Sequence, residues 1–202
     1  TGKDGIGRLP IASEDIPRAR LGGAFTVAYA GTGADLVVEG SLGAHFIFWE
    51  WVTALIGAAI KIDPFNQPNV TEAKEKTGAL LQRWKGSGVV SPAPIFETTN
   101  IQVFSNQKFG SIAEYLAATY AMNPGYMALM AYLHRGIDDR ISLLRENLES
   151  ASGVPVTFGW GPRFLHSTGQ FHKGGPRTGS FIQITGATKI LWPIEGSGYG
   201  FE

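Results

Sequence analysis

Cysteine is absent from the 202 residues of this chain. Without thiols the chain can form no disulfide framework, no cysteine nucleophile and no thiolate metal site. This composition is compatible with a cytoplasmic protein, which is the location we expect. A zinc site would need several histidine or carboxylate ligands to converge, and the HExxH spacing is missing, so we expect no metal.

Charge is also scarce. Charged residues make up 17% of the chain, and 17 Lys and Arg balance 17 Asp and Glu to a net charge of zero. A balanced charge argues against a nucleic-acid partner and against binding to a membrane surface. The glycine-rich turns match neither the P-loop nor the full GxGxxG fingerprint, and no GxSxG elbow is present. Nucleotide binding and serine hydrolase chemistry are therefore not favoured.

Long hydrophobic runs are limited to one stretch, residues 43–60, which is about as long as a membrane-spanning helix. It contains His45, Glu50 and Thr53, and Lys61 and Asp63 follow it. These polar residues favour a core helix of a soluble protein over a membrane span. On that interpretation His45 is a hydrogen-bonded core residue.

The sequence does contain an alternation of strand-like and helix-like segments. Short runs rich in β-branched and aromatic residues predict strands at 24–30, 34–39, 100–104, 126–133, 155–160 and 180–185. Apolar residues at helical spacing predict helices at 43–60, at 69–86 with Asn69 as the cap, at 111–120 with Ser111 as the cap, and at 137–150. The nearly continuous apolar run at 126–133 suits a parallel sheet covered on both faces. We therefore predict an α/β fold, a three-layer sandwich with a mostly parallel sheet, in one domain over residues 1–202.

The first loop that could carry chemistry spans residues 62–74 and leads into a predicted helix. A helix N-terminus offers free backbone N–H groups and a positive dipole end, which together attract anions. Lys74 would add a mobile positive charge beside a ligand that Gln67 contacts. The alternative is an ordinary proline-rich loop with a solvated lysine.

A second loop, residues 159–179, holds six glycines, two histidines and three cationic side chains. Long loops in compact domains are usually functional or mobile. The cationic side chains, Arg163, Lys173 and Arg177, suit an anionic ligand, and either His166 or His172 could transfer protons near neutral pH. The alternative is a flexible surface loop. His134, which follows a predicted strand, is a weaker candidate for proton transfer, and we predict that it is a turn residue.

Three segments resemble motifs of bacterial glucose-6-phosphate isomerases. IDPFNQPNVTEAK (62–74) is similar to the N-P-F-D/N-Q-P-x-V segment that precedes a functional lysine, LHSTGQ (165–170) to the L-H-S-x-G-Q segment that holds the catalytic histidine, and GKDGIGRLP (2–10) to G-K-x-G-K-G. Together they resemble the second sugar-isomerase (SIS) domain of that family. The stretch GPRFLHSTGQFHKGGP (161–176) most resembles the isomerase part of bacterial transaldolase/glucose-6-phosphate isomerase fusions. In ordinary members the histidine motif precedes the lysine motif, whereas here it follows, an order that the fusions share.

The resemblance implies the interconversion of glucose 6-phosphate and fructose 6-phosphate in glycolysis and gluconeogenesis, without a cofactor. The sugar ring opens, and a proton moves between C1 and C2 through an enediolate. His166 would be the acid and base of ring opening, Lys74 would balance negative charge at the same oxygens, and Gln67 would bind the sugar phosphate. Arg163, Lys173 and Arg177 are further anion contacts, inferred from their charge. A homodimer is also implied, because the family's histidine often reaches the neighbouring subunit's site.

Two parts of the family's active site are expected outside this chain. The general-base glutamate lies just upstream of the G-K-x-G-K-G segment, and most phosphate-binding Ser and Thr residues belong to an N-terminal SIS domain. The chain is therefore expected to be a piece of a longer protein, with that missing domain as a partner, and to be nearly inactive alone. Two alternatives stay open: a non-catalytic sugar-phosphate-binding SIS module, and a structural interaction domain.

Overall fold

The computed structural model describes residues 2–7, 9, 25–87, 92–166, 168–187, 192–196 and 200–201. The chain divides into two compact units, one made of Thr1–Val70 and Gly125–Thr185 and the other of Thr71–Pro124 and Gly186–Glu202. The assignment of one SIS-type domain to residues 1–202 stays a prediction.

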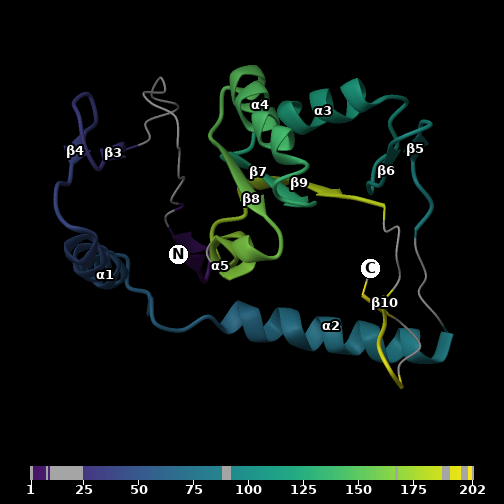
Figure 1. Ribbon diagram of the computed structural model, residues 1–202, viewed down its shortest axis with the longest axis horizontal. Helices are drawn as coiled ribbons and strands as arrows, with labels where there is room; N and C mark the ends of the chain where they lie inside the picture. Colours follow the sequence, from purple (N-terminus) through teal and green to yellow (C-terminus); the bar gives the residue numbers. More distant parts are fainter. Residues whose placement is uncertain are drawn as a thin grey trace. The chain divides into compact units, whose positions relative to one another are not determined.

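The core of the first unit is a three-stranded parallel sheet (Figure 1). Its central strand is β7 (Tyr126–Tyr132), with β8 (Val156–Trp160) on one side and β9 (Gly179–Thr185) on the other. Met127, Ala128 and Leu129 are at most 1% exposed. A strand flanked by neighbours and covered on both faces needs apolar side chains at successive positions, which is why the run at 126–133 has no polar alternation. The predicted strands at 126–133, 155–160 and 180–185 are confirmed.

Helices cover both faces of this sheet (Figure 1). A 3-10 turn, η1 (Asp139–Leu143), and α4 (Leu144–Ser152) connect β7 to β8, and α4 packs against β8. A second 3-10 turn, η2 (Arg163–His166), and α5 (Gly169–Gly174) connect β8 to β9. Right-handed crossovers that run in opposite directions along a sheet place their helices on opposite faces. The predicted α/β class, with helix layers on either side of a parallel sheet, is confirmed.

Two short strand pairs complete the strands of this unit. An antiparallel hairpin is formed by β1 (Gly2–Lys3) and β2 (Ile6–Gly7). The strands predicted at 24–30 and 34–39 shorten to a parallel pair, β3 (Val27–Ala28) and β4 (Leu36–Val37). The residues just before these two strands are also joined. The Asp35 carboxylate accepts hydrogen bonds from the backbone N–H and the hydroxyl of Thr26, both at 2.8 Å.

The apolar stretch forms helix α1 (Leu42–Ala59), and Ser41 caps it by accepting a 3.3 Å hydrogen bond from the Ala44 N–H. Gly57 is its one buried residue. The prediction of a core helix is therefore wrong for this chain: α1 is mostly apolar, but the rest of the described chain covers little of it. Among the described residues, α1 is also the one helix long and apolar enough to cross a membrane by length and composition, and 6% of it is buried.

The second unit contains most of α2 (Pro68–Ser87), whose first turn belongs to the first unit. It also holds β5 (Phe96–Glu97) paired with β6 (Gln102–Val103), α3 (Ile112–Ala121), and β10 (Trp192–Pro193) paired with β11 (Gly200–Phe201). Ser111 caps α3 as predicted, because its hydroxyl accepts from the Glu114 N–H at 3.1 Å. The Glu114 carboxylate reaches back to the Gly110 N–H at 2.8 Å, which fixes the start of the helix.

Candidate functional site

The candidate site is built around α5, inside the segment predicted as a long loop. Residues 163–166 and 169–174 form helical turns, so η2 and α5 occupy much of the 159–179 segment. The apolar anchor of α5 is Phe171, which packs on Tyr126 and Ala128 of β7. Because Phe171 fixes α5 on the sheet, the neighbouring polar side chains of α5 have defined positions. These helical turns were not predicted from the sequence.

A partly buried hydrogen bond joins α5 to the start of α2. Gln170, which is 3% exposed, donates from Nε2 to Oδ1 of Asn69 at 2.8 Å. These residues end the LHSTGQ segment and lie within IDPFNQPNVTEAK, 101 positions apart along the chain. The prediction that Asn69 caps the helix is wrong, because α2 begins at Pro68, a residue suited to the first helical position. The Asn69 side chain instead accepts from Gln170.

The third motif segment also contacts α5. The hairpin β1–β2 turns at Asp4 and Gly5, which both have positive φ angles of 53° and 75°. Such angles suit a two-residue Asp-Gly hairpin turn. From this turn the Gly5 N–H donates to the Gly174 carbonyl at 2.9 Å, at the end of α5. The Asp-Gly pair is a readable hairpin signal in the sequence, although no hairpin was predicted there.

The loop before α2 is held by local hydrogen bonds on either side of Gln67. Oδ1 of Asp63 accepts from the Phe65 N–H at 2.8 Å, and the Gln67 carbonyl accepts from the Val70 N–H at 3.1 Å. The second bond closes a turn at the start of α2. The Gln67 side chain is exposed, and Asn69 two positions later carries the link to α5.

His172, the second histidine considered for proton transfer, faces the sheet. Its Nδ1 lies 3.0 Å from the hydroxyl of Tyr126, and the two rings are stacked with centroids 5.7 Å apart. Burial lowers the pKa of His172 below its ordinary value, and the positive charge of Lys173 lowers this pKa further. Burial also raises the pKa of Tyr126 to about 12. The pair is therefore uncharged at neutral pH and anchors α5 to β7.

The other predicted site residues are exposed to solvent. His166 is the last residue of η2, and the predicted anion contacts Arg163, Lys173 and Arg177 also lie on the first unit. Lys74 is exposed on α2 and belongs to the second unit. The structure thus brings the histidine motif and the Gln67 loop together through Gln170 and Asn69. His134 is exposed after β7 and lies in a turn, as predicted. Its backbone carbonyl accepts hydrogen bonds from the Ile137 and Asp138 N–H groups.

Nothing in the described part of the chain forms a cluster of three or more His, Asp or Glu side chains able to hold a metal ion. The chemistry available near α5 is therefore that of an imidazole, amides and cationic side chains. Imidazole can give and accept protons near neutral pH, and cationic side chains can bind a phosphate.

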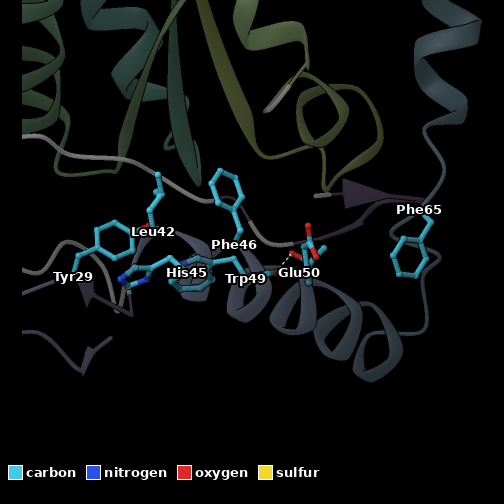
Figure 2. Close-up of a pocket in the computed structure, with 8 residues that line it drawn as sticks. Tyr29, Leu42, His45, Phe46, Trp49, Glu50 and Phe65 are labelled. Atoms are coloured by element: carbon cyan, nitrogen blue, oxygen red, sulfur yellow. Dashed lines mark hydrogen bonds between the residues drawn. The ribbon is translucent and has the colours of Figure 1, made fainter. Parts of the chain in front are cut away.

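A separate pocket of about 670 Å³ lies on α1 (Figure 2). Figure 2 shows Leu42 and Phe46 projecting from the helix, with Tyr29 beside His45 and Trp49 and with Phe65 at the other end. The Tyr29 ring meets the His45 ring edge to face, with centroids 5.0 Å apart. His45 is not the hydrogen-bonded core residue that was predicted, because its Nδ1 has no hydrogen-bond partner among the described residues.

Comparisons of the chain with protein-family models, with curated proteins and with solved structures find no match. The functional interpretation therefore depends on the motif segments and on how the structure connects them.

Proposed function

We propose that this chain is the second SIS domain of a cytoplasmic glucose-6-phosphate isomerase. The observation that carries the proposal is the position of α5. Gln170 binds the segment 62–74, Gly174 binds the hairpin of the segment 2–10, and α5 itself continues the segment 165–170. Three segments that resemble one family's motifs therefore meet at a single short helix. Motifs that resembled the family by chance would have no physical reason to meet.

In the proposed reaction His166 protonates the ring oxygen and removes the hydroxyl proton, which opens the sugar ring. Lys74 balances the negative charge that develops at the same oxygens, and Gln67 binds the phosphorylated sugar. Arg163, Lys173 and Arg177 supply positive charge for the phosphate. A base then removes the C2 proton of glucose 6-phosphate and returns a proton to C1 of the enediolate. No cofactor is needed, because the substrate is neither oxidised nor reduced overall.

The proposed general base is a glutamate just upstream of the segment 2–10, within a longer protein that also supplies the N-terminal SIS domain. A carboxylate that is merely solvated cannot replace a positioned one, because general-base catalysis needs the base within hydrogen-bond reach of the proton. We therefore expect the isolated 202-residue chain to show almost no isomerase turnover. Turnover by the isolated chain at the rate of the longer protein would contradict the assignment of the base.

The test is a coupled assay of fructose 6-phosphate conversion in the longer protein, with His166→Ala and Lys74→Ala variants. Removing a positioned acid or base typically slows a reaction by roughly 10²- to 10⁴-fold, and we expect losses in that range for both variants. His134→Ala is the matched control, since His134 is an exposed histidine in a turn outside the motif segments. Circular dichroism confirms that each variant is folded.

The assay also separates the proposal from its main alternative, a sugar-phosphate-binding module without catalysis. A longer protein that shows no turnover, but whose melting temperature rises with fructose 6-phosphate by mass action, would be such a module. Neither turnover nor a thermal shift would leave a structural interaction domain as the better account.

A further inference from the structure

The pocket on α1, which we call the α1 pocket, is lined mainly by rings. The ring-bearing residues of its lining are Tyr29, His45, Phe46, Trp49 and Phe65. All five belong to the first unit, so the pocket lies within one unit. Its volume of about 670 Å³ falls inside the range of roughly 300–1,000 Å³ that is usual for small-molecule sites.

The Tyr29 ring stands nearly perpendicular to two rings of the helix. It makes an angle of 86° with the His45 ring and of 87° with the Trp49 ring, at centroid distances of 5.0 and 6.4 Å. His45 and Trp49 are four positions apart and therefore share one face of α1. Tyr29 and Phe46 are each 63% exposed. Much of the surface of these two rings is thus open to a ligand.

The lining presents few hydrogen-bond donors. Nε1 of Trp49 and Nδ1 of His45 are buried atoms, and the Thr53 hydroxyl donates to the Trp49 carbonyl at 2.7 Å. No lysine or arginine is among the described residues that line the pocket. An anion needs donors or positive charge, and a sugar needs several hydrogen bonds. Both are therefore poorly matched to the α1 pocket.

The acidic residue of the lining is Glu50. It lies four positions after Phe46 on the same face of α1, and Figure 2 shows its carboxylate between the side chains of Phe46 and Phe65. Within the described part of the chain Glu50 forms no ion pair, and residues 42–59 include no basic residue. The negative charge at the α1 pocket is therefore not compensated by the described residues.

Exposed rings and a carboxylate attract the same class of ligand. A cation within about 6 Å of a ring centroid is attracted by the π electrons of the ring, and the carboxylate adds a full negative charge. A neutral apolar ligand would cover Glu50 without compensating its charge. A primary ammonium is strongly hydrated and needs three hydrogen-bond acceptors, whereas the methyl groups of a quaternary ammonium fit against ring carbons.

We propose that the α1 pocket binds a small organic cation that carries a quaternary, methylated ammonium group. The ammonium group contacts Tyr29 and Phe46, and Glu50 balances its charge. The proposal depends on the α1 pocket alone and is independent of the proposed isomerase activity.

The first experiment titrates the 202-residue chain with choline by isothermal titration calorimetry at pH 8, where free imidazole is uncharged. The comparison ligand is 3,3-dimethylbutanol, in which carbon replaces the charged nitrogen of choline. We expect choline to bind at least about tenfold more tightly, because the rings and the carboxylate both favour the charge. Equal affinities, or no binding of choline, would overturn the proposal. This comparison uses the unaltered chain, so it does not depend on the folding of any variant.

The second experiment removes one ring. In Tyr29→Leu we expect the affinity for choline to fall by roughly 2- to 30-fold, the range for one cation–π contact. Trp51→Leu is the matched control, because it removes a 66% exposed ring of the same helix that does not line the pocket. It should bind choline as the unaltered chain does. Equal affinities of the two variants would contradict the assignment of choline to the α1 pocket.

The third experiment removes the charge. Glu50→Gln keeps the size of the side chain, and we expect it to weaken choline binding by about 2- to 5-fold, the effect of a solvent-exposed ion pair. Glu39→Gln is the control, since Glu39 is an exposed glutamate outside the lining. Binding of 3,3-dimethylbutanol should be no weaker in Glu50→Gln than in the unaltered chain. Unchanged choline binding in Glu50→Gln would remove the carboxylate from the proposed site.

Trimethyl-lysine side chains of modified proteins carry the same ammonium group. The volume of the α1 pocket, which suits a small molecule, is the reason for proposing a free cation. A short peptide with one trimethyl-lysine between uncharged residues is the probe, and we expect it to bind no more tightly than choline. Much tighter binding of the peptide, lost in Tyr29→Leu, would assign the pocket to a modified protein and overturn the choice of a small molecule.

Discussion

Gln170 is the residue on which the candidate site depends most. It is a polar side chain at 3% exposure, and its bond to Asn69 holds two distant parts of the chain together. Gln170→Met keeps the volume but removes the donor, so we expect the free energy of unfolding to fall by about 0.5–1.5 kcal/mol, the usual net contribution of an intramolecular hydrogen bond. Urea denaturation of the isolated chain measures this loss.

Two variants make this prediction specific. Asn69→Asp keeps an oxygen acceptor for Gln170 and should lose less stability than Gln170→Met. Gln67→Met alters an exposed amide of the same loop, and we expect its unfolding free energy to match that of the unaltered chain. If Gln170→Met and Gln67→Met were equally stable, the hydrogen bond between Gln170 and Asn69 would make no measurable contribution to the unfolding free energy.

His172 makes stability depend on pH. Burial lowers its pKa below the ordinary 6.5, so the unfolded chain takes up a proton at a higher pH than the folded chain does. The unfolding free energy should therefore be highest above pH 6.5, fall as the pH drops through that value, and level off below the folded-state pKa of His172. Replacement by glutamine, which cannot gain this charge, should reduce the pH dependence.

Denaturant unfolding from neutral to mildly acidic pH checks this expectation. His134→Gln is the control, because His134 is an exposed histidine in a turn, and it should keep the pH dependence of the unaltered chain. The role of His172 would be refuted by a His172→Gln variant whose stability falls just as steeply between neutral pH and pH 5.

At the scale of elements, the end of α5 has no space for a side chain. A Cβ added to Gly175 would lie 2.6 Å from the Phe171 carbonyl oxygen, a backbone atom that cannot turn away. Gly175→Ala should therefore destabilise the chain by about 1–3 kcal/mol, the usual cost of overpacking. Gly78→Ala in α2 is the control, since nothing lies within 4 Å of its Cβ, and it should be neutral or stabilising by up to about 1 kcal/mol. Thermal unfolding of both variants gives the comparison.

The elements differ in how much of them the sequence could predict. The strand at 126–133 was clear, because a run with no polar alternation suits a strand enclosed on both faces. The helical turns at 163–166 and 169–174 were not, because six glycines in 21 residues are typical of a loop. The helicity there depends on Phe171 packing against Tyr126, a contact between residues 45 positions apart that no local pattern records.

The candidate site shows the same limit. The residues of the Gln67 and His166 loops could be named from their motif segments, but the bond from Gln170 to Asn69 depends on the folded backbone. The prediction for α1 was wrong for a related reason: an apolar helix must be covered, but the sequence does not say by what. Here the described residues leave most of α1 exposed.

The strand order β8-β7-β9 has one more consequence. The connection after β7 leads to β8 on one side of it, and β9 lies on its other side, so the strand order reverses between β7 and β9. Open α/β sheets bind their ligands outside the carboxyl ends of the strands, at such a topological switch point. Because η2 follows β8 directly, His166 lies beyond the carboxyl end of β8, at the same edge of the sheet. The winding of the chain thus favours the edge at which the proposed site has its histidine.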